Sequence, residues 1–217
     1  MTKLIVFDCD GTLVDSQAAI CRSMEAAFRA AGLAAPDRNA VRRIVGLSLP
    51  QALVHLAPDA PEDRRRHALE AYKASFRSAR SEGVLEEPLY PGIERLLRRA
   101  HAGGRTLGVA TGKSDRGLAA CLKRHGVRAL FTTLQTADRH PSKPHPAMLE
   151  AALIEAAVSP HEAVMVGDTV FDVAMARAAG VRAIGVAWGY HEPAELLEAG
   201  ACGVAESVEE LELLIDG

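Results

Sequence analysis

The sequence lacks several features that would assign it to a class at once. None of its apolar runs is long enough to cross a membrane, and its first residues do not combine a basic region with an apolar run, as a signal peptide does. Its net charge of −3 gives no electrostatic reason to expect a nucleic acid or an anionic membrane as partner. We therefore expect a cytoplasmic protein that binds neither nucleic acid nor membrane.

Closely spaced cysteines, internal repeats and low-complexity tracts are also missing. The four cysteines are scattered with no C-x-x-C spacing, which predicts reduced, buried thiols rather than disulfides or a metal site. The chain has 217 residues, of which 48% are hydrophobic. That length suits one large domain, or a core with a smaller insert, and that composition allows a sizeable core.

What the sequence does contain is a short apolar run, residues 4–7, that ends in two aspartates, Asp8 and Asp10. The run predicts a buried strand. Two carboxylates at the end of a buried strand are costly unless a positive charge compensates them, and a hard divalent cation such as Mg²⁺ suits oxygen ligands. Gly11 would let the backbone turn sharply beyond the pair.

The periodicity of apolar residues predicts an α/β fold with an inserted helical segment. Residues 17–31 and 38–83 show helical spacing without a convincing strand, whereas strands and helices alternate after Pro91, where a helix is expected to begin. Expected strands cover 106–110, 130–134, 163–166 and 183–186, separated by helices at 115–125, 146–157 and 171–179. This alternation predicts a Rossmann-like parallel sheet with the first strand central. We assign residues 1–15 and 88–217 to this core, and 16–87 to an all-helical cap.

Polar residues follow several of the predicted strands. Thr111 and Gly112 follow the second, Lys143 lies a short loop after the third, and Asp168 and Asp172 follow the fourth. Because the carboxyl ends of parallel strands share one edge, these residues can converge with Asp8 and Asp10 at a single site.

Together these segments resemble the four motifs of the haloacid dehalogenase superfamily of hydrolases, in the right order along the whole chain. The resemblance is closest to phosphoglycolate-phosphatase-like members with a helical cap after the first motif. The segments that carry it are Asp8-Cys9-Asp10-Gly11-Thr12, Thr111-Gly112, Ser142-Lys143-Pro144 and Gly167-Asp168-Thr169 through Asp172.

The resemblance implies a mechanism. Asp8 would be the nucleophile that forms an aspartyl-phosphate, and Asp10 the acid and base. Asp8, Asp168 and the carbonyl of Asp10 would bind Mg²⁺, with Asp172 beside these ligands. Lys143, the Thr111 hydroxyl and a nearby backbone N–H at Gly112 would bind the phosphoryl oxygens. The expected partner is a small phosphorylated metabolite, and the protein a monomer or homodimer.

Two parts of the insert are candidates for substrate contact. Arg43 and Ser48 flank Gly46 in a segment that resembles the family's cap loop, although Arg43 could equally lie on a solvated helix face. Lys73, Arg77 and Arg80 recur at i, i+4 and i+7 and form one basic stripe. For this stripe a solvated face is the favoured interpretation, with a role toward substrate as the alternative.

Other functions share part of this pattern. A metal-free dehalogenase would not need Asp10 and Asp168 together, and phosphonate hydrolases lack the acid at the position of Asp10. A sugar phosphomutase uses the same aspartyl-phosphate chemistry and stays open. A receiver-like phosphoacceptor is disfavoured because receivers are about half this length and have no helical insert. The expected activity is therefore phosphatase activity on a small phosphomonoester whose identity the sequence leaves open.

Overall fold

A six-stranded parallel sheet forms the centre of the protein, in a computed structural model that describes residues 2–217. The strand order is β3-β2-β1-β4-β5-β6, so the first strand lies inside the sheet, as predicted. The strands are β1 (Leu4–Phe7), β2 (Thr106–Thr111), β3 (Phe131–Thr136), β4 (Ala163–Gly167), β5 (Arg182–Val186) and β6 (Val204–Ala205). The α/β fold class is confirmed.

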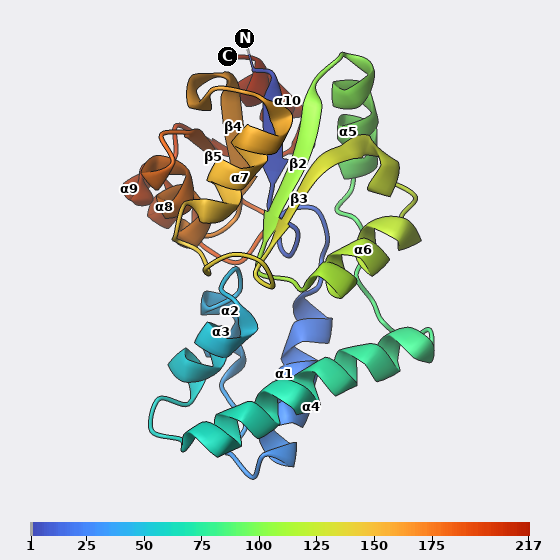
Figure 1. Cartoon of the computed structure of the whole chain (residues 1–217), viewed down its shortest axis with the longest axis vertical. Coiled ribbons are helices and arrows are strands. Elements are labelled where there is room, and N and C mark those ends of the chain that lie inside the picture. The colour runs from blue at the N-terminus through green and yellow to red at the C-terminus, as the bar shows by residue number, and fades with distance from the viewer. Residues whose placement is uncertain (1) are drawn as a thin grey trace.

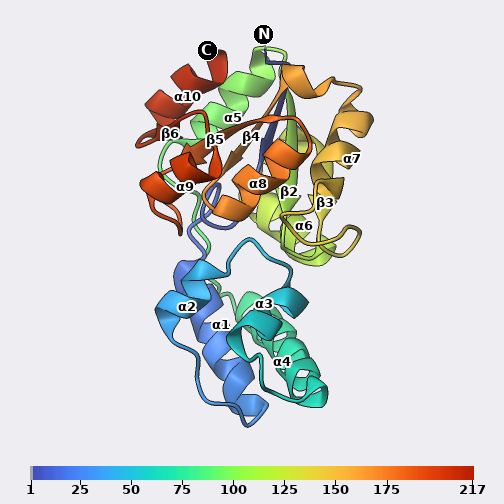
Figure 2. The ribbon, with the colours of Figure 1, turned by 90° about the vertical axis from the view of Figure 1, so that its left-hand side faces the viewer.

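Helices cover both faces of the sheet because alternate residues of β1 point to opposite sides. Ile5 and Phe7 pack in one apolar cluster with α5 (Ile93–Ala102), α6 (Asp115–Arg124) and α10 (Val208–Asp216). Leu4 and Val6 pack in a second cluster with α7 (Ala147–Ala156), α8 (Val170–Ala178) and α9 (Pro193–Ala199). The result is a three-layer core, seen edge-on in Figure 2.

A helical insertion follows β1, as predicted, and no segment of residues 16–87 is a strand. Its helices are α1 (Gln17–Ala30), α2 (Arg38–Arg43), α3 (Leu49–Leu56) and α4 (Glu62–Ser81). They enclose a third apolar cluster, which includes Met24, Phe28 and Leu53 and is joined by Tyr190 of the core. Figure 1 shows the insertion beyond the carboxyl ends of the strands, at the opposite end of the molecule from both termini. The assignment of residues 16–87 to a separate domain stays a prediction.

Several details differ from the sequence-based expectations. Pro91 lies outside α5, because Gly92 takes the N-cap position with a left-handed φ of 85° and the helix begins at Ile93. Two short 3-10 helices, η1 (Arg128–Leu130) and η2 (Pro160–Glu162), precede β3 and β4. Of the four free cysteines, Cys202 is exposed and the others are buried as expected. No helix within residues 2–217 has the length and apolarity needed to cross a membrane.

Candidate active site

Three buried aspartates meet at the carboxyl edge of the sheet. Asp8 follows β1 directly, Asp168 follows β4, and Asp172 lies in the first turn of α8. Each offers a carboxylate oxygen, and these oxygens lie within 4.8 Å of one another. The parallel sheet brings together residues 160 positions apart, as the sequence predicted for Asp8 and Asp168.

Lys143 is the cation that directly contacts this cluster. Its side chain is fully buried, and its Nζ lies 2.9 Å from Oδ1 of Asp8 and 2.5 Å from Oδ1 of Asp172. The two carboxylates raise the pKa of Lys143 above its ordinary value, although burial acts in the opposite direction. Lys143 therefore stays charged and offsets part of the negative charge of the three aspartates.

Asp168 and Asp172 are held by hydrogen bonds from residues to which the sequence assigned no role, although Thr12 and Thr169 lie within the motif segments quoted above. Thr12 donates its hydroxyl to Oδ1 of Asp168 at 2.7 Å, and the backbone N–H of Tyr190 donates to Oδ2 at 2.9 Å. Thr169 donates both its hydroxyl and its N–H to Oδ2 of Asp172. Thr169 is the N-cap of α8, so a cap signal pointed to it, but the contact of Thr12 with Asp168 spans 156 positions and leaves no local signal.

Asp8 differs from the other two because neither of its buried carboxylate oxygens has a hydrogen-bond partner of good geometry among the described residues. Burial raises the pKa of Asp8 to about 7, and the positive charge of Lys143 offsets this only in part. Burial also raises the pKa of Asp168 well above its usual value, and the charge of Asp172 adds to the effect. An additional cation is therefore what the site needs electrostatically, and the cluster of hard oxygen donors fits a divalent metal ion.

Asp10 is not part of the three-aspartate cluster, and its side chain contacts Ser16 and Lys113. Its Oδ1 accepts a hydrogen bond from the Ser16 hydroxyl and lies 2.9 Å from Nζ of Lys113. Lys113 in turn lies 2.7 Å from Oε1 of Glu87, which is only 2% exposed. Ser16 takes the N-cap position of α1, but its side chain makes no capping hydrogen bond and contacts Asp10 instead. Lys113 adjoins the Thr111-Gly112 motif, which could have drawn attention to it, whereas Glu87 carries no sequence signal.

Thr111 and Gly112 lie where the insertion meets the core. Thr111 is the buried last residue of β2 and lines the same cavity as Asp8 and Asp10. A Cβ on Gly112 would lie 2.5 Å from the backbone oxygen of Leu47 in the insertion. Glycine is therefore required for this close approach of two backbones.

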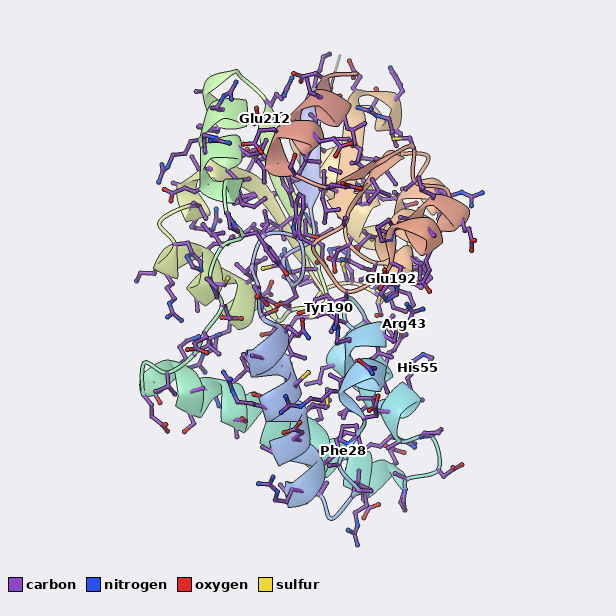
Figure 3. The ribbon with its side chains drawn as sticks, turned by 180° about the vertical axis from the view of Figure 1, so that it is seen from behind. Phe28, Arg43, His55, Tyr190, Glu192 and Glu212 are labelled. Atoms are coloured by element: carbon purple, nitrogen blue, oxygen red, sulfur yellow. The ribbon has the colours of Figure 1, made fainter. Side chains whose placement is uncertain are left out.

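The two cap-loop candidates have different surroundings. Ser48 lines the cavity, and its N–H donates to Oγ of Ser142 at 2.7 Å. The Arg43 side chain instead forms a bidentate ion pair with Glu195 of α9, with N–O distances of 2.5 and 2.8 Å, and does not line the cavity. Figure 3 shows Arg43 at the junction between the insertion and the core, where Tyr190 also lies. A role of either residue in substrate choice stays a prediction.

A cavity of about 410 Å³ lies between the core and the insertion. Asp8, Asp10 and Thr111 line its core side, residues 44–50 and the second half of α4 line its insertion side, and Lys143 and Asp168 are covered behind Asp8. The predicted catalytic residues are therefore gathered at one end of a cavity large enough for a small organic ligand.

Comparisons with known proteins agree with this arrangement. The model of the family described as "Haloacid dehalogenase-like hydrolase" matches residues 5–186. "Probable phosphatase IndB" of Dickeya dadantii (strain 3937) is 37% identical over 202 residues, which cover 90% of this chain and 86% of that protein. "Phosphoglycolate phosphatase" of Vibrio vulnificus (strain CMCP6) is 29% identical over 218 residues, with 96% and 94% covered. The crystal structure of a "predicted phosphatase from Clostridium acetobutylicum" superposes with a TM-score of 0.88 at 27% identity, covering 99% of this chain and 98% of that one.

Proposed function

Because this chain belongs to the haloacid dehalogenase-like hydrolases and is a phosphatase of that family, we propose that it hydrolyses a small phosphomonoester through an aspartyl-phosphate, with Mg²⁺ as cofactor. The observation that carries the proposal is the state of Asp8: a buried carboxylate at the end of the cavity whose oxygens have no well-oriented donor. A carboxylate without such partners is available both to a metal ion and as a nucleophile.

The residues that would hold the ion are Asp8, Asp168 and the backbone carbonyl of Asp10. Mg²⁺ bound there would offset the repulsion between the Asp8 carboxylate and a dianionic phosphoryl group. Asp172 belongs to the same group of oxygens, but its two oxygens already accept hydrogen bonds from Lys143 and Thr169. We assign to Asp172 the positioning of Lys143 beside Asp8.

In the first step a carboxylate oxygen of Asp8 attacks the phosphorus atom, and the bond from phosphorus to the alcohol oxygen breaks. Protonated Asp10 gives its proton to that oxygen, so the alcohol leaves as a neutral molecule. The buried ammonium of Lys143 and the hydroxyl of Thr111 stabilise the charge on the phosphoryl oxygens. The products of this step are the alcohol, ionised Asp10 and an aspartyl-phosphate at Asp8.

In the second step Asp10 removes a proton from a water molecule, whose oxygen attacks the phosphorus atom. The bond from phosphorus to the Asp8 oxygen breaks, which releases inorganic phosphate and restores both carboxyl groups. Ser16 and Lys113 hold the Asp10 carboxylate from the side of the insertion. Asp10 therefore acts first as the acid and then as the base.

A panel of phosphomonoesters assayed with and without Mg²⁺ tests the proposal, with phosphoglycolate included because relatives of about 30% identity carry that name. We expect Mg²⁺-dependent release of inorganic phosphate, and a loss of several orders of magnitude in kcat for Asp8→Asn. Near-normal turnover by Asp8→Asn would contradict the covalent mechanism. A panel in which sugar phosphates isomerise without release of phosphate would instead identify a mutase.

A further inference from the structure

The cavity extends well beyond the residues that would bind a phosphoryl group. From Asp8 it continues along an apolar wall formed by side chains of α1 and α4, which are Ile20, Met24, Leu69, Tyr72 and Phe76. The rings of Tyr72 and Phe76 lie in contact, with their centroids 5.0 Å apart. A volume of about 410 Å³ falls in the range of about 300–1,000 Å³ typical of small-molecule sites. This wall therefore offers an apolar surface to the alcohol part of a substrate.

Four cationic side chains line the same cavity further from Asp8. Lys73, Arg77 and Arg80 lie on α4, and Arg116 lies in the first turn of α6, which belongs to the core. The three residues on α4 share one helix face and span about 10 Å at a rise of about 1.5 Å per residue. Figure 1 shows that the end of α4 lies below α6, so the insertion and the core both contribute positive charge here.

Most of this charge is unpaired. In the described part of the chain, no carboxylate lies within ion-pair distance of Arg77, Arg80 or Arg116, and Lys73 has a partner in Glu70 at 3.3 Å. Asp138 is the acid that lines this part of the cavity, and its Oδ2 accepts the N–H of Asp115 at 2.9 Å. With Lys73 paired to Glu70, the three unpaired arginines against Asp138 leave a net positive charge in this part of the cavity.

The first half of α4 provides a contrast within the same helix. Arg64 donates to the carbonyl of Ala31, Arg65 to the carbonyl of Ala60, and Arg66 forms an ion pair with Glu62. These arginines lie outside the cavity lining and have partners within the protein. On α4, the arginines without partners among the described residues are therefore the ones that line the cavity, where Arg77 is also exposed to solvent.

We propose that this cavity binds a phosphomonoester whose alcohol part carries a second anionic group, a carboxylate or a phosphate, beyond an apolar segment. Arg77, Arg80 and Arg116 bind that second group, and the wall at Tyr72 and Phe76 contacts the segment between. The proposal rests on the proposed function in one respect, because it assumes that the first phosphoryl group lies at Asp8. Arginine suits both anions because its planar fork can donate two parallel hydrogen bonds.

Matched substrates test the proposal. For chains of four and of six carbons, kcat/KM is measured for the alkyl phosphate, the phosphonooxy carboxylate of equal length and the terminal bisphosphate. The charged tails should raise kcat/KM about tenfold to a hundredfold over the neutral tail at one length or both, which is the effect of one or two charge-assisted hydrogen bonds. The carboxylate and bisphosphate arms show which anion is preferred. A ratio near one at both lengths, or a preference for the neutral tail, overturns the proposal.

Substitutions of the arginines test whether these residues bind the second anionic group. In the double variant Arg77→Gln/Arg80→Gln, the ratio of kcat/KM for a charged tail to kcat/KM for the alkyl phosphate should fall toward one. The same ratio should fall less in Arg116→Gln. In both variants kcat/KM for the alkyl phosphate itself should be unchanged. Arg66→Gln is the matched control on the same helix and should keep the wild-type ratio. Added salt should reduce the same ratio in the wild type, because Arg77 and Arg116 are exposed to solvent and their charges are screened. An unchanged ratio in the double variant would assign the second anion to other residues and contradict the proposal.

Equilibrium binding separates this proposal from the proposed function. If the protein hydrolyses none of these compounds, nor p-nitrophenyl phosphate, the proposed function fails. Calorimetry with the Asp8→Asn protein then still decides about the second site. Tighter binding of the charged tails, lost in the arginine double variant, supports the proposal, whereas equal binding or none overturns it.

Discussion

Replacement of Asp8 by asparagine should stabilise the metal-free protein while it abolishes turnover. Asp8 is 1% exposed, lies in a group with Asp168 and Asp172, and lacks a well-oriented hydrogen-bond donor. In the unfolded chain its carboxylate is solvated by water. Folding at neutral pH therefore either buries this charge or requires a proton to be taken up, and both options lower the free energy of unfolding.

The magnitude follows from the pKa of Asp8, which burial raises from 3.8 to about 7. A carboxyl group with a raised pKa binds more protons in the folded than in the unfolded state between these values, so stability falls as pH rises from about 4 to 7. About three pH units at about 1.4 kcal/mol each correspond to roughly 4 kcal/mol. The buried amide of asparagine would lack one partner, at a cost of about 1–3 kcal/mol, so a net gain of about 1–3 kcal/mol is expected at pH 8.

Thermal unfolding in the presence of EDTA, followed by circular dichroism from pH 4 to 8, measures this effect. For Asp8→Asn we expect a flatter pH dependence and, at pH 8, a Tm higher by about 2–10 °C. Lys143 keeps Asp172 as a partner in the variant, so the substitution leaves no isolated cation. Asp59→Asn, on an exposed turn of the insertion, is the control and should change neither quantity.

Mg²⁺ should reverse the order of stability. The ion binds the folded wild type and stabilises it by RT ln(1 + [Mg²⁺]/Kd), whereas Asp8→Asn has lost a ligand. A variant that is less stable than the wild type at pH 8 in EDTA, or that keeps the full slope between pH 4 and 7, would refute the assignment of this cost to Asp8. Equal stabilisation of both proteins by Mg²⁺ would show that Asp8 is not a ligand.

Three further predictions concern the residues around Asp8. Asp10→Asn should slow alkyl phosphates more than p-nitrophenyl phosphate, because a good leaving group needs less protonation; equal losses of kcat for both would exclude Asp10 as the acid. Lys113→Met leaves Asp10 and Glu87 without their buried cation and should lower the free energy of unfolding in urea by about 3–5 kcal/mol. A change below about 1 kcal/mol would show that both ion pairs of Lys113 are solvated. Gly112→Ala should displace the backbone of Leu47 and lower kcat/KM while Mg²⁺ still stabilises the protein; unchanged kinetics would show that the contact is not maintained in solution.

The sheet and the acidic site were accessible from sequence because their signals are local. Each predicted strand is a short apolar run, and in a parallel sheet the residues that follow such runs converge. That reasoning is confirmed for the fold, and Asp8, Asp168 and Asp172, which it predicted to converge, lie together in the structure. The C-terminal elements β6, α9 and α10 were not predicted, although Ser207 has the side-chain contact of an N-cap at the start of α10.

The contacts between distant segments could not be predicted. Arg43 pairs with Glu195, 152 positions away, and both side chains are ordinary exposed charges in the sequence. Lys113 and Glu87 are 26 positions apart in the sequence, with Glu87 before β2 and Lys113 after it. Which charged residues pair depends on the path of the backbone, since spacing fixes partners within a helix or strand but not between elements. For the same reason the sequence could not place the stripe on α4 relative to the cavity: Lys73 and Arg77 are exposed, as the favoured solvated face predicts, and all three residues also line the cavity.

The contacts of Asp10 connect the chemistry to the position of the insertion. Ser16 lies on the first connection between core and insertion and donates to Asp10, and Glu87 lies on the second connection and contacts Asp10 through Lys113. The two connections also meet each other, through an antiparallel bridge between Val14 and Leu89. Asp8 depends on none of these contacts, because β1 and the carboxyl edge of the sheet position it. A movement of the insertion that displaces either connection would therefore alter the surroundings of Asp10, the proposed acid and base, and leave Asp8, the proposed nucleophile, in place.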